Sequence, residues 1–103
     1  MATPNPAAKL DTILAVLESR LPEWKARFGI TEVGVFGSVV RGEDGEGSDL
    51  DVLVDYQTAP SLFQLSALQR EMSRITGRNV DLSLRQTLRP AIGKRILAEV
   101  VYL

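Results

Sequence analysis

The sequence predicts one α+β domain, a two-layer fold in which a small mixed sheet of three strands carries helices packed on one face. Its 103 residues suit a single domain, and 45% of them are hydrophobic, which is enough for one core. Leucine stripes at helical spacing alternate along the chain with short β-branched segments, giving the order α-β-α-β-α-β-α. We expect residues 1–6 to be a disordered lead and residues 7–103 to be the domain.

Two helices are expected ahead of the first strand. The first begins near Ala7 and has an apolar stripe of Leu10, Ile13, Leu14, Leu17 and Leu21. Pro22 cannot continue this helix but suits the first turn of a second one. That second helix buries Trp24 and Phe28, and it is expected to stop at Gly29.

The middle of the chain predicts two strands separated by a turn and a loop. Residues 31–36 are rich in β-branched and aromatic side chains, and residues 38–41 follow as one helical turn. Residues 42–47 contain three glycines and three acids, which predicts a mobile, exposed loop. In the second strand, residues 50–56, the two faces alternate: Leu50, Val52 and Val54 on one, Asp51, Leu53 and Asp55 on the other, with Asp49 just before them.

The last third predicts a helix, a strand and a final helix. Ser61 and Gln64 have the spacing of a capping box, and the helix that they open is stopped by Gly77. Residues 79–84 alternate as a strand. A last helix starts at Pro90 and is expected to run to the C-terminus and pack on the sheet, with a stripe of Ile92, Ile96, Val100 and Leu103.

The composition excludes several classes of chemistry. The chain has no cysteine and no histidine, so it has neither disulfides nor Cys-His or Ser-His-Asp catalysis. Its net charge of −1 does not predict direct nucleic-acid binding. The first residues lack the pattern of a signal peptide and no apolar run is long enough for a membrane span, so a soluble cytoplasmic protein is expected.

Gly37 and Ser38 follow directly after the first predicted strand. A glycine there lets backbone N–H groups approach an anion, and the helical turn that follows points further N–H groups toward it. The simpler interpretation is that Gly-Ser merely breaks the strand.

Three aspartates are expected on the same face of the sheet. Asp49 and Asp51 are two residues apart at the start of a strand, and paired carboxylates of this kind suit a divalent cation such as magnesium. Asp81 lies in the third predicted strand and joins them if the two strands are neighbours. Each acid alone is also explained as a solvated strand residue, but one shared site explains all three together.

Arg41 is the one base within an acidic stretch. It either neutralises triphosphate oxygens or pairs locally with Asp44 or Asp49. Four further bases lie near the C-terminus and form either a solvated helix face, the favoured interpretation, or a surface for an acidic partner: Arg85, Arg89, Lys94 and Arg95.

The composite pattern is Gly-Ser-x-x-Arg-Gly at 37–42, Ser-Asp-x-Asp at 48–51 and Val-Asp-Leu at 80–82. It resembles the nucleotidyltransferase superfamily, and most closely the minimal nucleotidyltransferases (MNT), the small antitoxins of HEPN/MNT toxin–antitoxin pairs. The resemblance extends over nearly the whole chain. One departure is Val39-Val40, where an alanine commonly precedes the arginine.

The resemblance implies a Mg²⁺-dependent transfer of AMP from ATP, with two metal ions. The implied nucleotide-binding residues are Gly37 and Ser38, with Arg41 as a further candidate, and the implied metal-binding and catalytic residues are Asp49, Asp51 and Asp81. Asp81 would be the third ligand and would activate the acceptor hydroxyl.

The resemblance implies that the acceptor is a tyrosine of a cognate HEPN ribonuclease toxin, which the transfer silences. A chain of 103 residues leaves no room for an acceptor-binding domain, so we expect the acceptor to be brought by another macromolecule or the site to be shared across an oligomer. The alternatives are an antitoxin that masks its toxin sterically, and a free-standing small-molecule adenylyltransferase. Either a homo- or a hetero-oligomer is compatible with the sequence.

Overall fold

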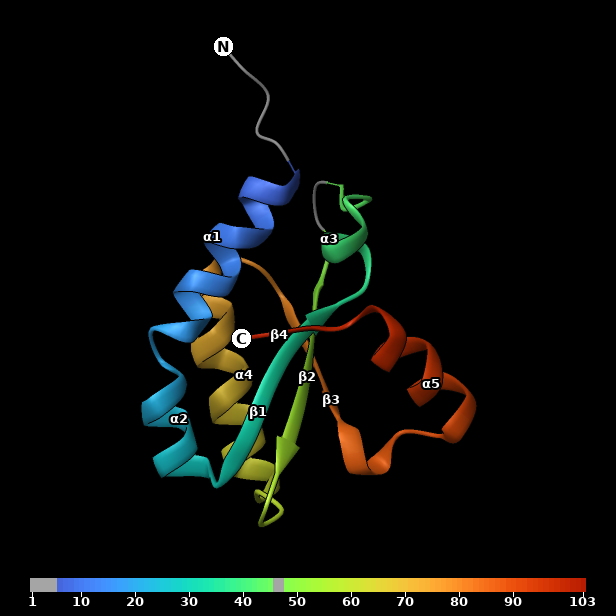
Figure 1. The fold of residues 1–103 in the computed structure, drawn as a ribbon. Helices are drawn as coiled ribbons and strands as arrows, with labels where there is room; N and C mark the ends of the chain where they lie inside the picture. Colours follow the sequence, from blue (N-terminus) through green and yellow to red (C-terminus); the bar gives the residue numbers. More distant parts are fainter. Residues whose placement is uncertain (1–5, 46–47) are drawn as a thin grey trace.

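The computed structural model describes residues 6–45 and 48–103. Two helices come first, and strands and helices then alternate along the chain (Figure 1). The elements are α1 (Pro6–Glu18), α2 (Leu21–Phe28), β1 (Ile30–Phe36), α3 (Ser38–Arg41), β2 (Leu50–Tyr56), α4 (Leu62–Thr76), β3 (Val80–Leu84), the 3₁₀ turn η1 (Arg85–Thr87), α5 (Pro90–Glu99) and β4 (Val101–Tyr102). Helix α1 thus already includes Pro6, the last residue of the expected lead, and residues 1–5 lie outside those described.

The sheet is mixed, as the sequence predicts. Its strand order is β3-β2-β1-β4, with β2 parallel to β3 and β1 antiparallel to both β2 and β4. The parallel register places Leu50 beside Val80 and Asp51 beside Asp81. The predicted neighbourhood of the strands that carry these aspartates is therefore confirmed.

The C-terminus corrects two predictions, because the sheet has four strands and the last helix stops at Glu99. Val100 adopts an extended conformation, and Val101 pairs with Val35 of β1. Two consecutive β-branched residues favour a strand over a helix end. Gly34 of β1 makes room for this C-terminal strand. A Cβ on Gly34 would lie 3.1 Å from the Tyr102 ring and closer still to the Val100 side chain.

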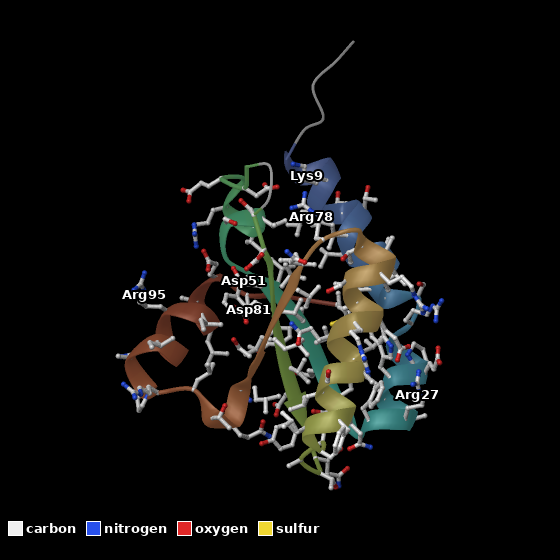
Figure 2. The ribbon with its side chains drawn as sticks, turned by 180° about the vertical axis from the view of Figure 1, so that it is seen from behind. Lys9, Arg27, Asp51, Arg78, Asp81 and Arg95 are labelled. Carbon is white, nitrogen blue, oxygen red and sulfur yellow. The ribbon has the colours of Figure 1, made fainter. Side chains whose placement is uncertain are left out.

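The helices do not all lie on one face, which is a further correction to the predicted architecture. In both views α1, α2 and α4 cover one face of the sheet and α5 lies on the other side (Figures 1 and 2). Leu17, Trp24 and Val52 belong to the main core under the three helices. Leu53 points to the opposite face, where it and Ile96 of α5 are both buried. An apolar residue on each face of β2 requires cover on each side.

Local signals set the helix ends as expected. The Ser61 hydroxyl accepts a hydrogen bond from the Gln64 N–H, and the Gln64 side chain accepts one from the Ser61 N–H, which completes the capping box of α4. Gly29 and Gly77 end α2 and α4 in left-handed conformation. Within 6–45 and 48–103, no helix has the length and apolar character needed to cross a lipid bilayer.

Two ion pairs anchor the acidic loop after α3, one to α1 and one to the turn after α4, whereas the sequence predicts a mobile, exposed loop. The Asp44 carboxylate lies 3.1 Å from both Lys9 Nζ and an Arg78 guanidinium nitrogen, and its side chain is only 5% exposed. Figure 2 shows Lys9 and Arg78 close together at one end of the molecule. The hydrogen bond from Lys9, together with that from Arg78, lowers the pKa of Asp44. Residues 46 and 47 of this loop lie outside the described part.

Replacing Asp44 should therefore destabilise the protein at neutral pH. We expect Asp44→Asn to lower the free energy of unfolding by about 1 kcal/mol in urea at pH 7. Because the pKa of Asp44 is lowered by folding, its contribution is present above the ordinary value of 3.8 and is lost as the pH falls through the lowered value. An equal loss in Asp11→Asn, a change of an exposed α1 carboxylate, would contradict a specific role for Asp44.

Candidate active site

The site forms where three elements meet: the turn from β1 to α3, the start of β2 and the start of β3. Gly37 makes this turn with φ 84° and ψ −154°, a conformation that is open essentially to glycine alone. A Cβ on Gly37 would overlap the Asp51 carboxylate oxygen Oδ2. Gly37 is therefore more than a strand break, since its missing side chain makes room for Asp51.

Ser38 opens α3 and is half-buried beside this turn. Because Gly37 stands at the N-cap of α3, no side chain caps the helix. Ser38 and Gly37 thus lie at the place that the sequence predicts for a nucleotide phosphate. Their role in binding one stays a prediction.

The predicted aspartates are brought to one region of the sheet. Asp51 and Asp81 are partners in the parallel register, and Figure 2 shows them side by side on β2 and β3. Asp51 is half-buried, whereas Asp49 and Asp81 are exposed. Burial raises the pKa of Asp51, and the negative charges of Asp81 and Asp49 raise it further, against the opposing effect of Arg41. The three carboxylates thus share one electrostatic environment.

This donor set fits a divalent cation by its chemistry. Carboxylate oxygens are the ligands that Mg²⁺ prefers, and a cation between them would relieve the repulsion felt by Asp51. Among the residues that the structure describes, however, no group of three His, Cys, Asp or Glu side chains is placed so that it could hold a metal ion.

Arg41 is engaged in ion pairs, but not with the partners that the sequence suggests. Its Nε lies 2.9 Å from Glu43 and its Nη1 2.5 Å from Glu99, instead of Asp44 or Asp49. The hydrogen bond to Glu43, followed by that to Glu99, raises the pKa of Arg41. Asp44 is unavailable to it because Lys9 and Arg78 hold that carboxylate.

Glu99 is a site residue that sequence reasoning missed. Besides pairing with Arg41, its carboxylate accepts a hydrogen bond of 3.0 Å from the Gly37 N–H. Burial alone would raise the pKa of Glu99, but the hydrogen bonds from Arg41 and Gly37 outweigh it and the pKa is lowered. No local motif marks Glu99, because it reaches Gly37 only through the pairing of β4 with β1 just beyond it.

A cleft of about 520 Å³ lies between this site and α5. Its residues are Phe36, Gly37, Arg41 and Asp51 on one side and Ile92, Arg95, Ile96 and Glu99 of α5 on the other. Asp51 therefore faces a space bounded by both apolar and charged side chains, which suits a small polar ligand with an apolar part.

Residues 17–103 match the family described as the nucleotidyltransferase domain. The chain is also 43% identical over 93 residues to the protein adenylyltransferase MntA of Thermococcus cleftensis, covering 90% of this chain and 94% of that protein.

Two solved structures have a similar fold. One, a candidate minimal nucleotidyltransferase, is 31% identical with a TM-score of 0.73, and each chain is covered completely. The other is a complex of the tri-AMPylated HEPN toxin of Shewanella oneidensis with its MNT antitoxin. It is 13% identical with a TM-score of 0.60, covering 95% of this chain and 71% of that one, and so bears on the fold alone. The match over residues 17–103 and the 43% identity show that this chain belongs to the nucleotidyltransferase family.

Proposed function

We propose that this protein is a Mg²⁺-dependent protein adenylyltransferase that transfers AMP from ATP to a tyrosine hydroxyl of a HEPN toxin and thereby acts as its antitoxin. The observation that carries the proposal is the register of Asp51 with Asp81, directly beside the glycine turn that makes room for Asp51. The 43% identical relative is named a protein adenylyltransferase, and a structural neighbour is a complex of an AMPylated HEPN toxin with an MNT antitoxin.

In this proposal each side chain has a distinct task. Gly37 and Ser38 hold the triphosphate at the start of α3, and Asp49, Asp51 and Asp81 hold Mg²⁺. When bound there, the metal would supply positive charge against the phosphate oxygens and the leaving pyrophosphate. Asp81, which is exposed, accepts the proton of the attacking hydroxyl. The new bond joins that oxygen to the α-phosphorus as the bond to pyrophosphate breaks, so AMP is transferred whole.

The direct test is transfer of label. Incubation with α-³²P-labelled ATP, Mg²⁺ and the purified HEPN partner should label the partner on tyrosine. Asp49→Asn should reduce the labelling at least about a hundredfold, because it removes a metal ligand. EDTA should have the same effect, and Asp11→Asn, an exposed carboxylate on α1, should have none.

The alternatives predict different results. A binding-only antitoxin would still neutralise its toxin after Asp49, Asp51 and Asp81 are all replaced by asparagine. A small-molecule adenylyltransferase would label a hydroxyl or amine compound in the absence of any protein partner. Either outcome, without labelling of the partner, would contradict the proposed function.

A further inference from the structure

Arg95 is one of the residues that line the cleft containing Asp51. It lies on α5 and lines the cleft together with Gly37 and Asp51, and its side chain is exposed. In Figure 2 its side chain lies at the outer edge of α5, apart from the labelled Asp51 and Asp81. Its charge reaches the cleft, because it contributes to the lowered pKa of Glu99.

The two arginines of the cleft differ in their existing partners. Arg41 is held between Glu43 and Glu99, at 2.9 and 2.5 Å. Arg95, by contrast, makes no hydrogen bond and no ion pair within the part of the chain that the structure describes. To contact a phosphate, Arg41 would first have to give up two carboxylates, whereas Arg95 has no direct hydrogen bond or ion pair to break among the described residues. Binding an anion therefore costs less at Arg95 than at Arg41.

Apart from the two arginines, the charged residues in and around the cleft are acidic. Asp51 and Glu99 line it, and Asp49 and Asp81 lie close enough to Asp51 for the charge of each to raise its pKa. A triphosphate adds further negative charge, which a metal ion offsets only in part. Arg95, which lines the cleft and has no direct ion pair among the described residues, offsets part of the remaining negative charge of the triphosphate.

We propose that Arg95, in place of Arg41, is the arginine that binds the triphosphate of the nucleotide in this cleft. This inference rests on the proposed function, since it assumes that ATP occupies the site beside Gly37. It also replaces the favoured sequence interpretation of Arg95 as part of a solvated basic face. The neighbouring Lys94 provides the contrast, because it lines a separate hollow with Arg85 and Leu97 and is also exposed.

The test is the affinity for a non-hydrolysable ATP analogue with Mg²⁺, measured by calorimetry without any acceptor protein. Arg95→Met should weaken binding about tenfold, the effect of losing one charge-assisted hydrogen bond at an exposed site. Arg95→Lys should recover part of the loss, and the wild-type affinity should fall more steeply with salt than that of Arg95→Met. Lys94→Met removes the same charge from the same helix and should leave the affinity unchanged.

Three outcomes would overturn the inference. Equal affinities for wild type and Arg95→Met would exclude a phosphate contact, even if transfer to the protein acceptor slowed. An equal loss of affinity in Lys94→Met would show that the effect comes from the change in net charge and not from a contact of Arg95. If the wild type itself bound no nucleotide, the proposed function would fail together with the inference, whereas in the first two outcomes the proposed function stands.

Discussion

Asp51→Asn should abolish AMP transfer without harming the fold. Asp51 is the half-buried member of the three aspartates and the one that contacts the glycine turn, so its replacement removes the central oxygen ligand. We expect the rate of transfer to fall about a thousandfold, corresponding to about 4 kcal/mol of lost transition-state stabilisation. The measurement is the initial rate of labelling of the partner at saturating ATP and Mg²⁺.

The stability of the same variant should change in the opposite direction. Because burial and the neighbouring aspartates raise the pKa of Asp51, folding disfavours its charged form. The carboxyl therefore supports folding best below its ordinary value of 3.8, and this support is lost as the pH rises through the raised value. Asp51→Asn should unfold at higher urea than wild type at pH 7.5, with the difference shrinking toward pH 4. A variant that is both inactive and less stable at pH 7.5 would contradict this account.

Gly37→Ala is expected to be the most damaging single change of the glycine turn. The backbone angles of Gly37 are unfavourable for alanine, and the added methyl group overlaps the Asp51 carboxylate. We expect the free energy of unfolding to fall by about 2–4 kcal/mol in urea denaturation. We also expect transfer activity to be lost even where the variant is folded, because the methyl group displaces Asp51.

Gly77→Ala is the matched control for this prediction. Gly77 also has a positive φ, 70°, but a Cβ there meets no atom within 4 Å. Its replacement should cost about 1 kcal/mol, from backbone strain alone, and leave transfer unchanged. Comparable damage from the two substitutions would mean that backbone conformation, and not the space for Asp51, decides the need for glycine at position 37.

Much of the site could be predicted from the sequence because its geometry follows from strand periodicity. Asp49 and Asp51 are two residues apart, and the alternation of β3 presents Asp81 beside Asp51 once the two strands pair. The capping box of α4 and the glycine stops were predictable for the same reason, since each depends on residues near in the sequence.

What could not be predicted depends on contacts between distant residues. Val100 and Leu103 continue the apolar spacing of α5, and only the pairing of Val101 and Tyr102 with β1 reveals a strand. The ion pair of Glu99 with Arg41 and its hydrogen bond from Gly37 link residues 58 and 62 positions apart. Helix α5 lies on the side of the sheet where Leu53 needs cover. The helical spacing within α5 does not reveal which side that is.

The pairing of β4 with β1 also closes one end of the cleft. Helix α5 is followed at once by β4, whose backbone is hydrogen-bonded to the strand that leads into Gly37. The two walls of the cleft are therefore joined by main-chain hydrogen bonds at their common end. The cleft is consequently a slot that is closed at the end where Glu99 of α5 accepts the hydrogen bond from Gly37. A protein acceptor would then have to present its hydroxyl on an exposed segment narrow enough to reach into that slot.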